Sequence, residues 1–529
     1  MTGSPSAYSV GFVFCMAAFL NAWRQHRRRG GFPLPPGPTG LPLIGSLLNI
    51  DSSHPWLSYE EWGKRHGGLV YANILGKDFI IINSVEVAHD LLERRSAAYS
   101  DRPYIPANEL FGMDFNSGLL PYGNQWRLHR KLFNTALNKK AISRYEPISL
   151  SKARQLVENL LDEPEDFAKH CKTFATATIM AAIYGYEVAP KNDPFVTKVE
   201  HFVGLFKEAL TPERAALLIA FPFLAHIPSW LPGGEYKQKA AECRALAEDV
   251  LTSPVEYVME NMAAGTAGKS VVHDLLGTQN SEEYEDTIKA VAASAFLGGA
   301  ETNDALLQVF ILAMVLHPEI QAKAREEIDR VVGTHRLPDF GDRPDLPYVE
   351  AVYRETFRWR PVVPSALPHM TVRSDIYQGM YIPKGAIVLT NIWAMAHDET
   401  RFDNPMAFIP ERHLTSAGTL AEETHLVLLS VLDGEIHMFA FVSGVDADGL
   451  CSRSCPGKHF ADQSVWGAIV TMLATLRIAK ACDEFGNEID IKAEFTGGLS
   501  SAPKPFVCSI TPCSSSAEDF IGTRHEHAY

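Results

Sequence analysis

Residues 453–461 read RSCPGKHFA, a stretch that places Cys455 at a tight turn directly before a helical run. Pro456 and Gly457 allow the backbone to turn sharply beneath a bound group, and helical spacing begins at His459. Backbone N–H groups at such a turn would point toward the sulfur, stabilise a thiolate and temper its donation to a metal. The stretch therefore predicts a cysteine that can bind a metal as a thiolate.

Two other interpretations of Cys455 compete with this one. A lone cysteine is most often a buried apolar thiol. A zinc site is the metal alternative, because Cys451, His437 and His459 lie close to Cys455 in the sequence. The Cys-x-x-Cys pairs typical of zinc sites are absent from the sequence, which makes zinc the weaker metal hypothesis.

A second stretch, AASAFLGGAETNDAL (Ala292–Leu306), interrupts an apolar helical run with Gly298-Gly299 and then with Glu301-Thr302. Each glycine costs roughly 1 kcal/mol relative to alanine in a helix interior, so the pair suggests close approach of a ligand or a local distortion. There a freed carbonyl can bond a hydroxyl or water. Glu301 and Thr302 place an acid and a hydroxyl on an apolar wall, as needed to deliver protons into a dry pocket. A helix with an exposed acidic turn is the alternative.

A third motif is Glu355-Thr-Phe-Arg358, which puts a carboxylate and a guanidinium three residues apart on one helical face. Such pairs are usually solvated surface contacts worth a few tenths of a kcal/mol. The motif gains meaning from its position in the chain, ahead of RFDNPMAFIPERH (Arg401–His413) and then of the cysteine stretch.

The remaining chain is predicted to be mainly α-helical. Helical spacing covers Tyr284–Leu316 and His317–Gly333, whereas Leu69–Ser84, rich in β-branched residues and with a Gly-Lys-Asp turn, predicts a hairpin. Residues 33–45 form a proline-rich connector that can be neither helix nor central strand. Because no internal repeat and no later Gly/Ser-rich linker is found, we expect one large domain over residues 31–529.

The N-terminus predicts a membrane anchor. Val10–Trp23 is apolar and is followed at once by Arg24 and Arg27–Arg29. A cleaved secretory signal would carry its charge before the apolar run, and under the positive-inside rule these arginines stay cytosolic. We therefore expect residues 1–30 to be a retained anchor with the rest of the chain in the cytosol. A buried or interfacial helix is the alternative, because the run is short for a span of about 20 residues.

Composition restricts the class of protein. Hydrophobic residues make up 46% and charged residues 21%, as in ordinary globular proteins. The net charge of −15 argues against broad affinity for nucleic acid, which needs clustered Lys and Arg. Eight scattered cysteines lack the density of a secreted disulfide scaffold and indicate a reducing compartment.

Taken in order, these motifs resemble the microsomal class of the cytochrome P-450 family, and in particular its fungal members of secondary metabolism. The resemblance runs from the proline hinge to the C-terminus, where FTGGLSSAPKPFVCSITP (Phe495–Pro512) is similar to a closing β-hairpin. The joint order of the motifs is far more specific than any one of them. In this sequence they are PPGPTGLPLIG (35–45), WRLHR (126–130), GGAET (298–302), RETFR (354–358), FIPERH (408–413) and RSCPGKHFA (453–461).

The resemblance implies a mainly α fold with small β-sheets, in which a long central helix lies over a heme b group and the cysteine loop lies beneath it. Cys455 would be the axial ligand of the heme iron, where thiolate donation favours O–O cleavage. Glu301 and Thr302 match the acid-alcohol pair that relays protons. The positions that match side chains bonding the heme propionates are Trp126, Arg130, His369 and Arg453. The positions that match a structural network behind the heme are Glu355, Arg358 and Arg412.

The implied activity is insertion of one oxygen atom from O₂ into a lipophilic small molecule, with electrons from NADPH through a reductase at the endoplasmic reticulum membrane. Basic side chains on the cysteine side, Arg130, Lys131 and Lys458, could dock that reductase or be solvated surface charges. Substrate contacts are expected from five segments. They are Tyr104–Leu120, Phe202–Trp230, Ala295–Gly299, Val362–Leu367 and Thr496–Ser501.

The cysteine loop departs from the family pattern FxxGxRxCxG, because Asp448 and Cys451 occupy the Phe and Gly positions. Skipping Val445–Cys451 restores the pattern, with Phe441 and Gly444 in those places. We therefore expect an insertion here, which translation of an unspliced intron would explain. A second extra segment is His425–His437.

Two rival functions stay open at this stage. The first is a heme-thiolate isomerase or dehydratase that rearranges a peroxide without O₂ or a reductase, against which Glu301-Thr302 speaks. The second is a membrane protein without catalytic heme, if the inserted loop prevents thiolate ligation.

Overall fold

The computed structural model describes residues 29–189, 193–209, 212–231, 234, 236–278, 281–421 and 453–514. The expected anchor, residues 1–30, lies almost entirely outside the described residues. So do the two expected insertions, His425–His437 and Val445–Cys451.

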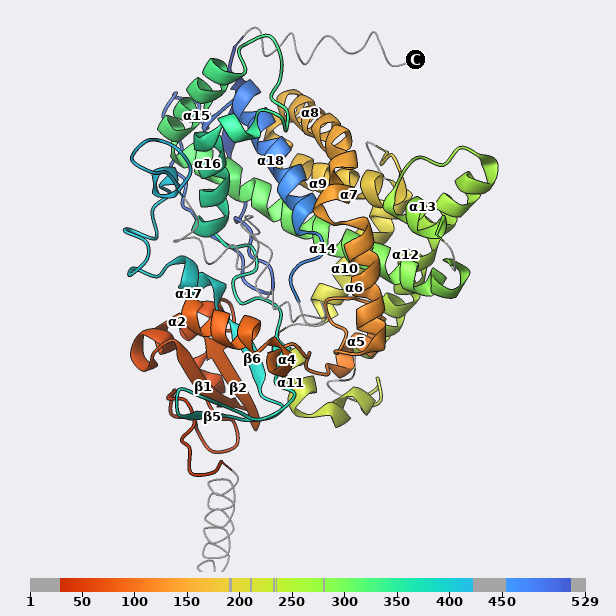
Figure 1. Ribbon diagram of the computed structural model, residues 1–529, viewed down its shortest axis with the longest axis vertical. Helices are drawn as coiled ribbons and strands as arrows, with labels where there is room; N and C mark the ends of the chain where they lie inside the picture. Colours follow the sequence, from red (N-terminus) through yellow and green to blue (C-terminus); the bar gives the residue numbers. More distant parts are fainter. Residues whose placement is uncertain are drawn as a thin grey trace, which may run out of the picture.

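Helices dominate these residues, as the sequence predicts (Figure 1). The α-helices are α2 (Pro55–His66), α3 (Val85–Ala88), α4 (Ser96–Tyr99), α5 (Pro106–Leu110), α6 (Asn124–Ala136), α7 (Lys139–Ile142), α8 (Glu146–Asp162), α9 (Phe167–Tyr184), α10 (Pro194–Ala209), α11 (Pro212–Ala220), α12 (Tyr236–Ala264), α13 (Val271–Leu276), α14 (Ser281–Leu316), α15 (Pro318–Val331), α16 (Pro347–Trp359), α17 (Ile392–Ala396) and α18 (Lys458–Thr475).

The strands form small sheets, as expected. A four-stranded sheet has the order β1-β2-β6-β3, while β4 pairs with β5 and β7 pairs with β8. Figure 1 shows the first sheet at one end of the molecule beside α2 and α17, with most of the helices at the other end. The strands are β1 (Leu69–Ile74), β2 (Lys77–Ile82), β3 (His369–Met370), β4 (Asp375–Tyr377), β5 (Met380–Ile382), β6 (Ile387–Thr390), β7 (Leu476–Lys480) and β8 (Cys508–Pro512).

The predicted hairpin at Leu69–Ser84 is confirmed as β1 and β2, which pair antiparallel. Its turn is one residue earlier than expected, because Lys77 already belongs to β2. Leu75 and Gly76 make the turn, with φ of 50° and 78°. Two positive φ values are the signature of the two-residue turn that matches strand twist, which explains the shift.

The expected closing hairpin within Phe495–Pro512 is wrong in its pairing. The strand Cys508–Pro512 pairs with β7, far upstream in the sequence. Only an isolated antiparallel bridge joins Phe495 to Pro503. A strand next to a completed helix found its partner there rather than across the local turn.

The long helix α14 lies at the centre of the core. Its C-terminal half, Ala305–Val315, is fully buried in a cluster with residues of α8, α9, α15, α16 and α18. Among the described residues one helical stretch, Glu285–Leu316, is long and apolar enough to cross a membrane. Since 61% of its most apolar window is buried inside the protein, it is a core helix of the fold.

Candidate active site

Cys455 lies in a turn that ends where α18 begins, as its sequence predicts. Burial raises the pKa of its thiol, while the N–H groups of Gly457 and Lys458 and the charge of Arg130 act to lower it. Arg130 Nη1 also donates to the carbonyl of Ser454 at 2.7 Å. The expected N–H groups therefore do point at the sulfur, and a metal cation would be needed to draw the proton from this thiol.

Two buried arginines and a buried histidine gather beside this turn. Arg453 donates from Nε to the carbonyl of Ser100 at 2.8 Å, and its guanidinium lies 4.3 Å from the ring centre of Trp126. Arg102 donates to the carbonyl of Leu367 at 2.8 Å. The third member, His369 in β3, is likewise buried.

These cations lower one another's pKa. Burial lowers the pKa of Arg102 to about 9, with the charge of Arg453 as the next cause and Asp101 opposing both. Burial and then the two arginines hold the pKa of His369 well below its usual value. His369 is therefore neutral and donates from Nδ1 to the carbonyl of Tyr99 at 3.0 Å. Clustered buried positive charge of this kind is stabilised by an anion.

The two adjacent glycines of α14 have separate roles. The helix runs through them without a break, so the expected distortion is not observed. A Cβ on Gly299 would lie 2.9 Å from Cδ1 of Ile179 in α9, so this glycine permits close helix packing. Gly298 is exposed in mid-helix, and a Cβ there would meet nothing within 4 Å. Open space therefore adjoins the middle of α14.

Thr302 lies one turn beyond Gly298 on the same face of α14. Its hydroxyl donates to the carbonyl of Gly298 at 2.7 Å. The sequence expectation that a carbonyl here meets a hydroxyl is thus confirmed, with the helix intact.

Glu301 is engaged by two other segments. Its Oε1 accepts hydrogen bonds from Lys207 Nζ of α10 at 2.5 Å and from Ser500 Oγ at 2.5 Å. The carboxylate therefore ties together α10, α14 and the loop before β8. The Glu301 and Lys207 side chains remain 38% and 58% exposed, so this ion pair is screened by solvent.

The Glu355 motif forms a fully buried network. Arg358 donates to both carboxylate oxygens of Glu355, at 2.7 and 2.8 Å, and Arg412 donates to Oε1 at 3.1 Å. His413 and the Ile409 N–H complete the set at 2.8 and 2.9 Å. Burial alone would raise the pKa of Glu355, but the hydrogen bonds from Arg358 and His413 outweigh it and bring the pKa to about 2.

The five segments expected to contact substrate converge. Apolar residues of the first two pack with α14 in one cluster, which includes Phe111, Phe202 and Leu297. A Cβ on Gly118 would lie 3.3 Å from Leu367, and Ser501 N–H donates to the carbonyl of Val362 at 2.7 Å. Ser500 reaches α14 through Glu301. Residues separated by hundreds of positions thus surround the same stretch of α14.

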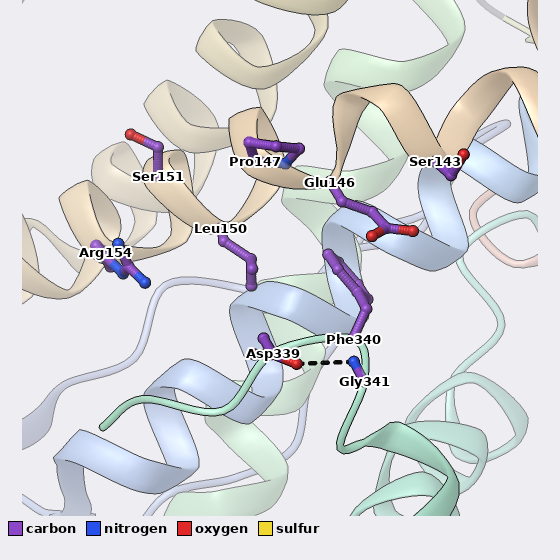
Figure 2. A pocket seen from close by; sticks show the side chains of 9 residues that line it. All are labelled: Ser143, Glu146, Pro147, Leu150, Ser151, Arg154, Asp339, Phe340 and Gly341. Atoms are coloured by element: carbon purple, nitrogen blue, oxygen red, sulfur yellow. Dashed lines mark hydrogen bonds between the residues drawn. The ribbon is translucent and has the colours of Figure 1, made fainter. Parts of the chain in front are cut away.

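A surface hollow of about 530 Å³ lies apart from these residues (Figure 2). It is formed by the start of α8 and the loop at Asp339–Gly341, and Figure 2 shows Leu150 and Phe340 facing the same space. Phe340 packs on Trp466 of α18, with ring centres 5.4 Å apart. None of the predicted site residues lines this hollow.

Comparison with known proteins agrees with this arrangement. The sequence model of the family described as "Cytochrome P450" matches residues 35–508. The chain belongs to the cytochrome P450 family.

Similar curated proteins are fungal. The cytochrome P450 monooxygenase claR of Ampulloclitocybe clavipes is 38% identical, over 92% of this chain and 88% of the relative. The monooxygenase COX1 of Coprinopsis cinerea is 36% identical, over 91% of both chains. The monooxygenase 208 of Postia placenta is 36% identical, over 98% of both. This P450 is accordingly an oxidoreductase that incorporates oxygen.

A heme group fits the site residues of this P450. The iron would take the sulfur of Cys455, and the two propionates would supply negative charge beside Arg102, Arg453 and His369. Nε of Arg102 is buried without a hydrogen-bond partner among the described residues, which is the kind of donor a carboxylate satisfies. With an anion beside it, His369 could gain a proton and donate from Nε2 as well.

Sequence reasoning about the P450 site missed two residues. Arg102 precedes a proline in a loop, and no motif spacing marks it. His413 stands in the quoted FIPERH, where its position directly after Arg412 was available as a signal.

The zinc alternative for this P450 depends on residues that are only partly described. His437 and Cys451 lie outside the described residues. In the described part of the chain, no group of three or more His, Cys, Asp or Glu side chains could hold a metal ion.

Proposed function

We propose that this P450 inserts one atom of O₂ into a lipophilic small molecule in secondary metabolism, with electrons that originate from NADPH and arrive through a reductase. The observation that carries the proposal is the exposed face at Gly298, where open space meets an apolar cluster drawn from the loop after α5, α10 and α14. An apolar wall with a few polar groups favours a lipophilic ligand.

The chain's own residues have distinct roles in this proposal. Heme, when bound, supplies the oxygen-activating chemistry. Cys455 holds it as a thiolate, and Trp126, Arg130, His369 and Arg453 hold its propionate side.

Protons are handled on α14. Thr302 keeps its hydroxyl proton in the bond to the Gly298 carbonyl, and rotation about χ1 would present that proton to the open face. Glu301 must leave Lys207 and Ser500 before it can resupply Thr302. Proton transfer is therefore expected to require movement of α10 or of the loop that carries Ser500.

The proposal also places the protein at the endoplasmic reticulum membrane. Residues 1–30 would be the anchor and 31–529 the catalytic domain, with the reductase docking near Arg130, Lys131 and Lys458. Arg130 is largely committed to Ser454, so exposed Lys131 is the better docking candidate. A chain lacking residues 1–30 should leave the membrane fraction on cell lysis, and its full retention there would remove the anchor from the proposal.

The central experiment is a reduced carbon-monoxide difference spectrum of the purified full chain. Thiolate-ligated heme gives a strongly red-shifted Soret band, and Cys455→Ala should abolish it. Persistence of the band in that variant would mean that another residue is the ligand. A full chain without the band would favour a protein that lacks catalytic heme.

Turnover separates the proposal from the isomerase alternative. Lipophilic candidates should be oxygenated only with NADPH, reductase and O₂ present, and Thr302→Ala should keep the band while diverting electrons to hydrogen peroxide. Rearrangement of a hydroperoxide without NADPH would support the isomerase instead. Sequencing of the transcript tests the two insertions, since a message that encodes both would remove the intron explanation.

A further inference from the structure

Three polar side chains from three elements meet beside the middle of α14. Ser117 belongs to the loop between α5 and α6, His129 to α6, and Ser294 to α14. Ser117 Oγ lies 2.7 Å from His129 Nδ1 and 3.2 Å from Ser294 Oγ. The backbone N–H of Ser117 also donates to Ser294 Oγ, at 3.0 Å. His129 is 1% exposed and Ser117 is 8% exposed, so water competes little with these bonds.

Counting protons fixes the direction of each bond. Ser294 has one hydroxyl proton, which goes to the carbonyl of Ala290 at 2.6 Å. Ser294 Oγ therefore accepts from Ser117, whose own hydroxyl proton is used in that bond. His129 must then donate from Nδ1 to Ser117 Oγ. Burial lowers the pKa of His129 to about 4, so a neutral imidazole with its proton on Nδ1 is the form that fits.

The position of this trio relates it to the ligand face. Ser294 lies one turn before Gly298 on the same face of α14, and Thr302 lies one turn after it. The next loop residue, Gly118, approaches Leu367 of a second converging segment. Ser117 is thus the point at which the loop after α5 is fixed to the helix that borders the open space.

We propose that His129, Ser117 and Ser294 form a clasp that positions the loop Phe111–Leu120 against α14 and so determines which ligand shapes the site accepts. The proposal rests on the proposed function, because it assigns specificity to the same site. His129 acts as a positioning residue through Ser117. It stands between Trp126 and Arg130 on α6, so the helix that supports the propionate side also sets the pocket wall.

The first measurement is amide hydrogen exchange on the purified full chain. Ser294→Ala removes the acceptor of the Ser117 N–H, and exchange of the peptide covering residues 112–120 should speed up about tenfold, which corresponds to about 1.4 kcal/mol. His129→Leu should do the same, and His129→Gln, whose amide can still donate to Ser117, should restore slow exchange. Thr471→Ala is the matched control, because its buried hydroxyl bonds only within α18.

The second measurement compares two ligands of different size by their optical binding spectra. Imidazole is too small to reach the loop, so its Kd should stay within about twofold of the unmutated protein, whereas the Kd of 4-phenylimidazole should change by about fivefold or more in Ser294→Ala and His129→Leu. His129→Gln should bind both as the unmutated protein does.

The outcomes are distinguishable. Unchanged exchange at residues 112–120 in Ser294→Ala, or an equal change in the Kd of both ligands, would overturn the clasp. If His129→Leu fails to fold by circular dichroism, Ser294→Ala and His129→Gln decide the matter. An unmutated protein without the red-shifted Soret band would sink the proposed function, while the exchange measurement would still test the clasp.

Discussion

Replacement of Glu355 by glutamine offers a quantitative test of the buried network. The glutamine keeps the shape of the side chain and removes its charge, which leaves the Arg358 side chain, only 2% exposed, without its counter-ion. The pKa of Glu355 falls from 4.5 to about 2 in the folded chain. At 1.36 kcal/mol per pKa unit, this shift corresponds to about 3 kcal/mol of stability at neutral pH. Breaking a buried ion pair costs a similar 3–5 kcal/mol.

The pH dependence of this loss has a definite sign. A carboxylate with a depressed pKa contributes its full stability above the unfolded value of 4.5 and loses it as the pH falls toward 2. The difference between Glu355→Gln and the unmutated chain should therefore be about 3 kcal/mol at pH 7 and only about 2 kcal/mol at pH 3.5.

The assay is urea unfolding followed by tryptophan fluorescence at several pH values, with heme content as a second readout. Glu61→Gln is the control, because its ion pair with Arg65 is exposed on both sides and should be worth a few tenths of a kcal/mol at most. A loss below about 1 kcal/mol at pH 7, or one that does not vary with pH, would refute the assignment of Glu355 as the anion of this network.

Three further predictions concern α14. Gly299→Ala should destabilise the fold by about 1–3 kcal/mol, because its Cβ would press on Ile179, and Ile179→Val should recover most of the loss in urea unfolding. Gly298→Ala should leave stability unchanged or raise it by up to about 1 kcal/mol while weakening 4-phenylimidazole binding, and unaltered binding would show that the open face is not the ligand face. Lys207→Met should change stability by less than about 0.5 kcal/mol, since the pair with Glu301 is largely exposed. It should also release less hydrogen peroxide per NADPH consumed, and an unchanged ratio would argue against Glu301 as a restrained proton donor.

Local signals in the sequence predicted the elements well. Apolar spacing over Tyr284–Leu316 corresponds to α14, whose bounds differ by three residues at the start. The hairpin at Leu69–Ser84 is present. Glu355, Arg358 and Arg412 meet because the first two share a helical face and the third lies in the loop that packs on it. In each case, short-range periodicity or motif order already contains the information.

Contacts between distant segments were not accessible in the same way. Arg102 joins the propionate side only because β3 and the loop before α5 are brought together by the sheet. The engagement of Glu301 by Lys207 and Ser500 depends on how α10 and a C-terminal loop cross α14. Strand β8 pairs with β7 rather than with its neighbour in sequence. Such long-range choices follow from the packing of the whole chain.

The two residues directly before Cys455 are fixed from outside their own loop, Arg453 by the carbonyl of Ser100 and Ser454 by Arg130. The ligand sulfur thus takes its position from α6 and the start of the loop after α4, and not from the length of chain that leads up to it. Because each doubling of a flexible loop costs only about 0.6 kcal/mol, this architecture can tolerate large changes in length just upstream of the cysteine. Natural variation and protein engineering could both exploit this freedom at that point without disturbing the metal-binding turn.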